Sequence, residues 1–373
     1  MRHMLNLFGA RSSRPPVWIK NSCGGDARAP RKMTILIIRL SSLGDVVLTT
    51  PVLAALKAAW PNAHITFLTK GAFAPVFTRH PFIDEIVGFE ERGLWGWAGE
   101  IRRRKFDLVI DLHDTVRSRV WSLLAGAPSR VRYDKRAADR RRLVWTKRVS
   151  PRLSGSVVDR YLETLAELGI PSGDRIPKLY LGADERLSEP LEKRLGPMPA
   201  GDPRFVAIAP GALHATKQWP AERFAAAADR LAEGRPVVVL GTRADARAAE
   251  EVLKTLTSPA QSFVGQTSLR DMMLILRRCA LLLTNDSGAM HVAAALGVPT
   301  VALFGPTVKA FGFFPLGAQT AVVEDSGLDC RPCSVHGTKK CPRGHFQCMK
   351  NVTVDQVVVA AQALLRKEPK GSS

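Results

Sequence analysis

The chain has 373 residues, of which 46% are hydrophobic and 7% aromatic, a composition suited to a soluble α/β protein with two ordinary hydrophobic cores. No uninterrupted apolar run reaches the roughly 18 residues of a membrane-spanning helix. Residues 1–32 are basic and lack the apolar core of a secretory signal. We therefore expect them to form a disordered extension, and we expect the protein to be cytoplasmic.

Positive charge is concentrated in one block of the chain. The formal net charge is +20, and residues 101–150 hold 15 Lys and Arg against 5 Asp and Glu. Such a block is expected to attract nucleic acid, anionic lipid or a phosphorylated glycan, with an ordinary solvated basic face as the alternative. No zinc-finger spacing, aromatic RNP-like stretch or helix-turn-helix accompanies the charge, so no nucleic-acid partner is expected.

Short apolar runs alternate with amphipathic stretches, which is the pattern of βα units in a mostly parallel sheet. The first half predicts strands at 34–39, 64–68, 85–89 and 107–111, and helices at 46–59 and 116–125. A proline-rich linker with one short helix follows over 171–204. The second half predicts strands at 205–209, 236–240, 262–264, 280–284, 299–303 and 320–323, and helices at 221–233, 244–256, 269–277, 288–296 and 354–366.

The first predicted strand ends in the turn Ser41–Asp45, which combines small side chains with a carboxylate. Small residues allow the backbone to pass close to a ligand or another loop, and ligands of parallel sheets bind at this edge. The alternative role for Asp45 is an N-cap of the following helix. The turn has neither the G-x-G-x-x-G pattern of dinucleotide sites nor the G-K-[ST] of a Walker loop.

A second strand-turn-helix unit carries the run Thr284–His291. Ser287 and Gly288 open a helix whose free N–H groups and positive dipole end suit a diphosphate. His291 lies one turn into that helix and is placed to reach the same anion. The structural alternative has Asp286 or Ser287 capping the helix and His291 as a hydrogen-bonded polar residue.

A third turn, Ala209–Ala212, is followed by Lys217 just before a helix. Lysine is an effective point charge for a phosphate group. Its alternative is an exposed surface lysine, and we expect the neighbouring Trp219 to be a packing residue.

These three elements, in this order, resemble glycosyltransferase family 9, the ADP-heptose:lipopolysaccharide heptosyltransferases, and among them the heptosyltransferase II type. The resemblance spans roughly residues 33–365 and is most specific in the runs D-S-G-A-M-H-V-A-A-A-L-G-V-P-T and S-S-L-G-D-V-V-L-T-T-P. It implies an α/β protein of GT-B architecture, with two facing Rossmann-like domains and mostly parallel sheets. We accordingly expect an acceptor-binding domain over 33–180, a nucleotide-sugar-binding domain over 181–353, and a last helix within 354–373 that returns to the first domain.

The resemblance also implies roles for individual residues. Asp45 matches the position of the catalytic base, and Lys217 that of the phosphate-binding lysine. The implied donor-binding set is Thr216, Lys217, Asp286, Ser287, Gly288, Met290 and His291, and the implied acceptor-binding residues are Arg117 and Arg119. The implied partners are an ADP-heptose donor, a Kdo-lipid A or heptosylated core acceptor, and the anionic inner face of the cytoplasmic membrane of a Gram-negative bacterium.

The chemistry of sugar transfer agrees with these roles, because it needs a base for the acceptor hydroxyl and charge stabilisation for the leaving diphosphate. No D-x-D pair, which commonly holds a metal ion in metal-dependent transferases, occurs in the sequence. We therefore expect inverting transfer without a metal or another cofactor.

Four cysteines lie close together in sequence, and the first two have the spacing of a zinc knuckle. The remaining spacing is not that of a standard finger. A structural zinc site, a disulfide and free thiols all stay open, although a cytoplasmic location disfavours a disulfide. The residues concerned are Cys330, Cys333, Cys341 and Cys348.

Three other functions are compatible with parts of the sequence. A related transferase with another nucleotide sugar or acceptor would share all three turns, since donor choice depends on a few side chains. A non-catalytic nucleotide-binding regulator of the same fold is disfavoured by the presence of Asp45. An NAD-linked oxidoreductase is disfavoured by the absence of the glycine fingerprint.

Overall fold

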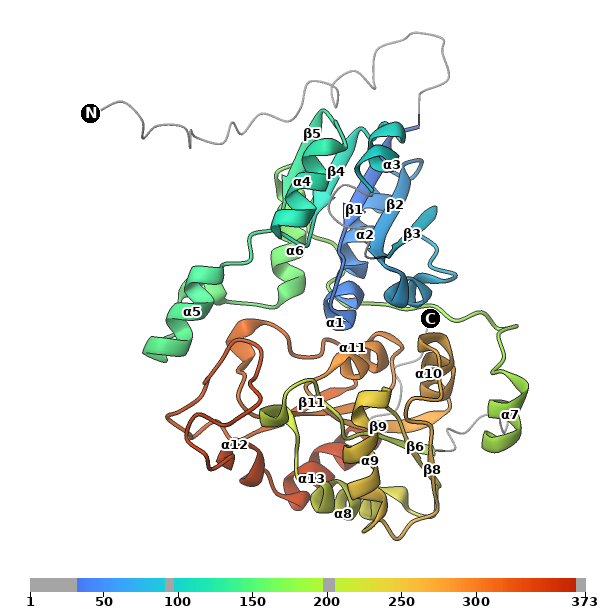
Figure 1. The fold of residues 1–373 in the computed structure, drawn as a ribbon, viewed down its shortest axis with the longest axis vertical. Helices are drawn as coiled ribbons and strands as arrows, with labels where there is room; N and C mark the ends of the chain where they lie inside the picture. Colours follow the sequence, from blue (N-terminus) through green and yellow to red (C-terminus); the bar gives the residue numbers. More distant parts are fainter. Residues whose placement is uncertain (1–31, 91–96, 197–204, 367–373) are drawn as a thin grey trace.

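The computed structural model describes residues 32–90, 97–196 and 205–366, so the predicted extension over 1–32 lies outside the described residues except for Lys32. The described chain forms two lobes stacked one above the other (Figure 1). Each lobe is built around one sheet in which all neighbouring strands are parallel. The predicted pair of facing α/β domains with parallel sheets is therefore confirmed.

The first lobe contains a five-stranded sheet of order β3-β2-β1-β4-β5. Its elements are β1 (Thr34–Ile38), α1 (Leu43–Val47), α2 (Thr50–Ala59), β2 (His64–Lys70), β3 (Glu85–Phe89), α3 (Ala98–Arg103), β4 (Leu108–Asp111), α4 (Val116–Leu124), β5 (Ser129–Arg132), α5 (Ala137–Thr146) and α6 (Val157–Ala166). Side chains alternate along the central strand, so Ile35 and Ile37 pack with α2 and α6, and Leu36 and Ile38 pack with α3 and α4.

The second lobe contains a six-stranded sheet of order β11-β10-β9-β6-β7-β8. Its elements are α7 (Glu189–Leu195), β6 (Phe205–Ala209), α8 (Ala221–Ala232), β7 (Val237–Val239), α9 (Ala246–Leu253), β8 (Ala260–Ser262), α10 (Leu269–Leu276), β9 (Cys279–Asn285), α11 (Gly288–Ala295), β10 (Thr300–Phe304), β11 (Thr320–Glu324), α12 (Gln347–Lys350) and α13 (Val354–Leu365). On β6, Ala207 and Ala209 pack with α10 and α11, whereas Val206 and Ile208 pack with α8, α9 and α13.

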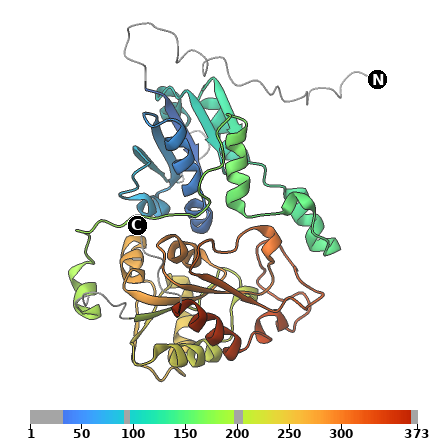
Figure 2. The same ribbon diagram turned by 180° about the vertical axis from the view of Figure 1, so that it is seen from behind.

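The lobes are joined by the segment between α6 and α7, which runs along the side of the molecule (Figure 2). Its backbone bonds to both lobes, since the Leu179 N–H donates to the Ala295 carbonyl and the Lys178 N–H to the Thr50 hydroxyl. Among the described residues, no helix combines the length and the apolar character needed to cross a membrane.

The predicted helix 46–59 is in fact two helices, α1 and α2. Pro51 stands in the first turn of α2 and has no N–H to donate to the Val47 carbonyl. The Thr50 hydroxyl bonds to that carbonyl instead, at 3.0 Å. This break frees α1 as a short unit that carries the turn residue Asp45.

The prediction that the last helix returns to the first domain is wrong. Helix α13 packs against α8 and against the β10–β11 side of the second sheet. Its buried residues, Val357, Val358, Ala361 and Leu364, belong to the core of the second lobe. Because this apolar face covers that side of the second sheet, the helix has no comparable face left for the first lobe.

Candidate active site

The two turns that the sequence singled out meet between the lobes, where α1 packs against α11. A Cβ atom on Gly44 would collide with the His291 ring, and one on Gly288 would lie 3.0 Å from a methyl group of Leu43. The lobes thus approach most closely at Gly44, where a side chain would displace the His291 ring, whereas at Gly288 the Leu43 side chain would have to shift slightly. The turns enclose a cleft of about 440 Å³ whose lining includes Asp45, Lys217, Asp286 and Ser287.

The Asp45 carboxylate is held in the wall of this cleft by three groups. One oxygen, Oδ2, pairs with Arg39 at 2.7 Å and accepts hydrogen bonds from the Ser42 N–H at 3.2 Å and the Ser42 hydroxyl at 2.9 Å. The other, Oδ1, has only the Tyr161 hydroxyl at 3.4 Å as a side-chain donor among the described residues. The N-cap of α1 is Ser42, so Asp45 is not the cap itself but the third helical residue, which bonds back to the cap.

The charge state of Asp45 follows from these contacts. Burial by itself would raise the pKa of the carboxyl, but the Arg39 charge and the hydrogen bonds from Ser42 outweigh it and hold the pKa below its usual value. Asp45 is therefore ionised at neutral pH. Its Oδ1 atom, with one hydrogen bond of 3.4 Å, is the less occupied of the two oxygens.

Arg39 is a site residue that the sequence reasoning missed. It is 5% exposed, donates to the Leu112 carbonyl at 2.6 Å and lies 5.6 Å from the centre of the Tyr161 ring. A basic residue at the end of a buried strand, directly before the turn, was the available signal. Tyr161 was missed as well, because it lies in α6, which was not predicted.

On the opposite wall, Lys217 pairs with Asp286 at 2.7 Å, and the lysine side chain is only 13% exposed. It is therefore not the exposed surface lysine of the alternative interpretation. Asp286 also accepts a hydrogen bond from the Thr307 hydroxyl at 2.9 Å, and Asn285 donates to the Pro210 carbonyl at 2.7 Å. These contacts fix residues 210–217, the lysine turn, against the start of α11. Lys217 and the first N–H groups of that helix therefore face one cleft.

Trp219 anchors the lysine turn to the core of the second lobe. Its indole N–H donates to the Val352 carbonyl at 3.0 Å, and its ring packs edge-on against Phe224. The residue is 3% exposed, so the expectation of a packing role is confirmed.

The histidines of the cleft are neutral at physiological pH. Burial lowers the pKa of His291 to about 4 and also lowers that of His336, a cleft residue that the sequence analysis did not identify. A neutral His291 can offer a ligand a hydrogen bond but no charge, so Lys217 is the cation of this wall among the described residues.

Two residues of the implied donor-binding set are not among those lining the cleft. Met290 is fully buried in a cluster with Ala302 and Phe304. Thr216 is 1% exposed, and its hydroxyl donates to the Thr338 carbonyl at 2.8 Å. The structure thus gives both side chains packing and anchoring contacts rather than a place in the cleft.

The implied acceptor residues Arg117 and Arg119 lie in the first turn of α4 and are not among the residues that line the cleft. Arg119 pairs with Asp114 at 2.7 Å and is half exposed. Contact of either arginine with an acceptor stays a prediction.

The cysteine segment contains free thiols in this structure. Cys330, Cys333, Cys341 and Cys348 are all unbridged, so the disulfide alternative is not supported. Within the described ranges, no group of three or more His, Cys, Asp or Glu side chains has an arrangement suited to a metal ion. The zinc alternative therefore has no geometric support here.

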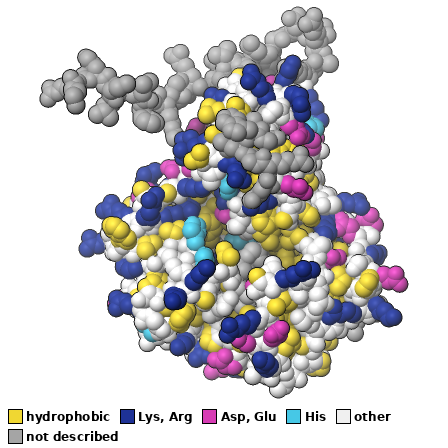
Figure 3. All heavy atoms as spheres, viewed as in Figure 1, with side chains coloured by type: hydrophobic (Ala, Val, Ile, Leu, Met, Phe, Trp, Pro, Cys, Tyr) yellow, Lys and Arg dark blue, Asp and Glu magenta, His cyan; other side chains and the backbone are white. Residues whose placement is uncertain are grey.

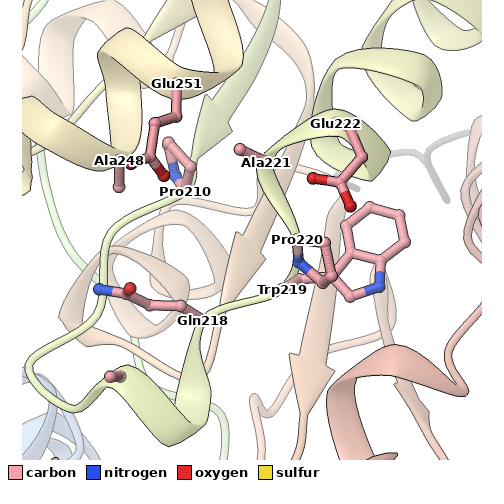
Figure 4. Close-up of a pocket in the computed structure, with 9 residues that line it drawn as sticks. Pro210, Gln218, Trp219, Pro220, Ala221, Glu222, Ala248 and Glu251 are labelled. Atoms are coloured by element: carbon pink, nitrogen blue, oxygen red, sulfur yellow. The ribbon is translucent and has the colours of Figure 1, made fainter. Parts of the chain in front are cut away.

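A second pocket, of about 270 Å³, is lined by residues of the lysine turn and of helices α8 and α9 (Figure 4). Its charged lining residues are Glu222 and Glu251, and no Lys, Arg or His of the described part of the chain lines it. A pocket with two carboxylates and no cation disfavours a diphosphate. The cleft between the lobes is therefore the candidate active site.

Comparison with known proteins agrees with this geometry. The model of glycosyltransferase family 9 (heptosyltransferase) matches residues 96–342. Lipopolysaccharide heptosyltransferase 2 of Escherichia coli (strain K12) is 28% identical over 359 residues, which cover 90% of this chain and 99% of that protein.

Solved structures give the same result. The glycosyl transferase family 9 protein of Veillonella parvula DSM 2008 superposes with a TM-score of 0.72 at 27% identity, over 89% of this chain and 97% of that one. The E. coli ADP-heptose lps heptosyltransferase II superposes with a TM-score of 0.68 at 25% identity, over 89% and 98% of the two chains. The GT-B fold is thereby confirmed, and the chain belongs to glycosyltransferase family 9, the heptosyltransferases.

Proposed function

We propose that this heptosyltransferase moves L-glycero-D-manno-heptose from ADP-heptose to the inner core of lipopolysaccharide, by inverting transfer without a metal ion. The names of the E. coli relative and of the E. coli structure, which refer to lipopolysaccharide and ADP-heptose, support this donor and this class of acceptor. The observation that carries the proposal is the cleft itself. One lobe presents a carboxylate, and the other presents a lysine and a helix N-terminus.

In this mechanism, Asp45 acts on the acceptor. The Oδ1 atom accepts the proton of the attacking hydroxyl as that oxygen bonds to the anomeric carbon. Arg39 and Ser42 hold Oδ2, which fixes the direction of Oδ1 and keeps the carboxylate ionised until the proton is transferred. Attack from the side opposite the leaving group gives inversion.

Lys217 and the start of α11 act on the donor. The leaving diphosphate gains negative charge as the sugar bond breaks, and fixed donors in a water-poor cleft stabilise that charge. Lys217 exchanges part of its contact with Asp286 for a phosphate oxygen, and Asp286 retains Thr307 as a partner. The N–H groups at Ser287 and Gly288 supply further donors at the positive end of the helix.

The acceptor is proposed to be Kdo-lipid A or a heptosylated core, presented at the inner face of the cytoplasmic membrane. These glycolipids carry carboxylates and phosphates, which suit the basic block 101–150 with Arg117 and Arg119. The direct test measures turnover with ADP-heptose against a panel of Kdo-lipid A and heptosylated acceptors. Turnover that requires a different nucleotide sugar would reassign the donor while leaving the cleft chemistry in place.

Chelation should leave the reaction intact. Because Lys217 and the α11 N-terminus supply positive charge to the leaving group, we expect less than about a twofold change in kcat after exhaustive EDTA treatment. The assay compares the treated enzyme with and without added Mg²⁺. Activity that disappears and returns with Mg²⁺ would contradict metal-independent transfer. Unfolding that only Zn²⁺ reverses would instead assign a metal to the cysteine segment.

Replacing Arg39 by glutamine should move the acid limb of the pH profile of kcat/KM to higher pH. Burial raises the pKa of Asp45 and the Arg39 charge lowers it, so removal of the charge leaves only the Ser42 hydrogen bonds to oppose burial, and the pKa rises. The base then becomes protonated at a higher pH than in the wild type. Arg104→Gln is the control, because Arg104 bridges Glu85 and Glu100 away from the cleft. An unchanged acid limb in Arg39→Gln would show that Asp45 is not the titrating base.

A further inference from the structure

Helix α5 is an arm of the first lobe that lies on the second lobe beside the cleft (Figures 1 and 2). On its inner face, Leu143 is buried in a cluster with Leu153 and with Phe311 of the second lobe. Arg140 donates to the Tyr133 hydroxyl at 2.8 Å and lies 5.1 Å from the centre of the Phe313 ring. These contacts hold the helix in a fixed orientation.

The C-terminal end of α5 is hydrogen-bonded to the cysteine segment, residues 330–348. Lys147 donates to the carbonyls of Cys330 at 3.3 Å and Pro332 at 2.7 Å. A mainly apolar groove of about 550 Å³, lined by Trp145 and Val335 among others, runs between helix and segment. Val335 also lines the catalytic cleft, so the groove and the cleft are neighbours.

The outer face of α5 and the residues after it combine apolar and basic side chains. Trp145 is 89% exposed and Val149 is 59% exposed, which is unusual for residues of this size and hydrophobicity. Arg141, Arg142 and Arg148 are exposed as well. Across the described ranges, no carboxylate lies within 4.0 Å of the basic nitrogens of these three arginines.

An exposed tryptophan surrounded by unneutralised arginines is the composition of a helix that lies in a membrane interface. The indole ring occupies the headgroup level, and the cations attract anionic lipids. Figure 3 shows dark-blue side chains around a small hydrophobic group on the left of the molecule, where Figure 1 places α5. The charge on this face complements an anionic bilayer.

We propose that the outer face of α5, with Arg141, Arg142 and Trp145, docks on an anionic phospholipid bilayer together with Arg148 and Val149, which follow the helix. Docking at this face brings the neighbouring cleft to the membrane surface. The assignment of the bilayer as the partner rests on the proposed function, since an acceptor of the inner core is anchored in lipid. The docking itself is measured without donor or acceptor, so its failure and the failure of the proposed reaction can be told apart.

The experiment is co-sedimentation of the full chain with vesicles of phosphatidylglycerol and phosphatidylethanolamine, and with vesicles of phosphatidylcholine alone. Each basic residue near an anionic surface strengthens partitioning about fivefold, so the double variant Arg141→Glu and Arg142→Glu should bind at least about 25-fold more weakly. Trp145→Ala should weaken binding by roughly fivefold. Binding of the wild type should fall as salt rises, because exposed charges are screened beyond about 8 to 10 Å.

Matched controls separate docking from net charge and from general hydrophobicity. Arg247→Glu in α9 with Lys254→Glu directly after it changes the net charge equally, and Val359→Ala removes an exposed apolar residue, 65% exposed, from α13. Both controls should bind like the wild type. The two controls and Trp145→Ala should keep wild-type turnover on a water-soluble, deacylated acceptor.

Three outcomes would overturn the proposal. Equal losses in the α9 control and in the α5 variant would assign binding to net charge. Wild-type binding by both α5 variants would exclude this face as the contact. A self-associated protein that Trp145→Ala converts to a smaller species by analytical ultracentrifugation, with vesicle binding unchanged, would identify the face as an interface between copies of the chain.

Discussion

Replacing Asp45 by alanine should lower kcat by about 10² to 10⁴, because a positioned general base contributes a factor of that size. Binding of ADP-heptose should change little, since the carboxylate acts on the acceptor from the lobe opposite the donor. Steady-state turnover gives the first quantity, and isothermal calorimetry with ADP-heptose gives the second. Asp45→Asn keeps the size of the side chain and should show the same loss of turnover.

The structure provides a matched control for the helix-capping role of Asp45. Asp271 occupies the same position in α10, where it accepts hydrogen bonds from the Ser268 N–H at 3.0 Å and the Ser268 hydroxyl at 2.6 Å. Asp271→Ala removes an equivalent cap and should lower stability by about 1 kcal/mol without affecting turnover. If Asp45→Ala also keeps near-normal turnover and only melts earlier, Asp45 has a capping role alone.

The two sheets could be predicted largely from hydrophobic runs, because the central strands are buried on both faces. Strand β1 illustrates this, because Ile35 and Ile37 are buried in the hydrophobic cluster on one face of the sheet and Leu36 and Ile38 in the cluster on the other. Strand β5 was missed because its sequence, Ser-Arg-Val-Arg, buries only Val131. An edge strand of this kind has no apolar run to detect.

Helix α6 was missed although its sequence carried a signal. Ser156 and Asp159 form a capping box, and the apolar residues that follow have helical spacing. Prolines and charged residues on either side obscure that pattern. The helix, and with it the position of Tyr161, was therefore not predicted. The partner of helix α13 was not predictable in the same way, since an amphipathic pattern specifies a buried face but not the sheet that covers it.

The candidate site followed from the three turns, because parallel strands bring their C-terminal ends to one edge. The lining of the cleft by Asp45, Lys217 and Asp286 agrees with that expectation. The ion pairs of this site could not be predicted from the sequence, however. Arg39 on Asp45 and Asp286 on Lys217 are contacts of the folded chain, and they set the charge that each group presents to a ligand.

Replacing Lys217 by alanine should weaken the binding of ADP and ADP-heptose by about 10- to 150-fold, because a charge-assisted contact contributes about 1.5 to 3 kcal/mol. Adenosine, which lacks the diphosphate, should lose less than about threefold. Calorimetry with adenosine, AMP and ADP measures this dependence on phosphate, and the difference between ligands isolates the lysine contact from any general damage to the pocket.

The control for this variant is Lys57→Ala. Lys57 is similarly buried, pairs with Asp84 at 2.9 Å and lies in the first lobe away from the cleft. Its loss therefore reproduces the removal of a lysine from an ion pair whose carboxylate keeps other partners, here the Ile65 N–H at 2.9 Å, without a change at the donor site. We expect Lys57→Ala to bind all three ligands like the wild type. Equal losses of adenosine and ADP in Lys217→Ala would place the lysine away from the phosphates, and the charge on the leaving group would then rest on the α11 N-terminus alone.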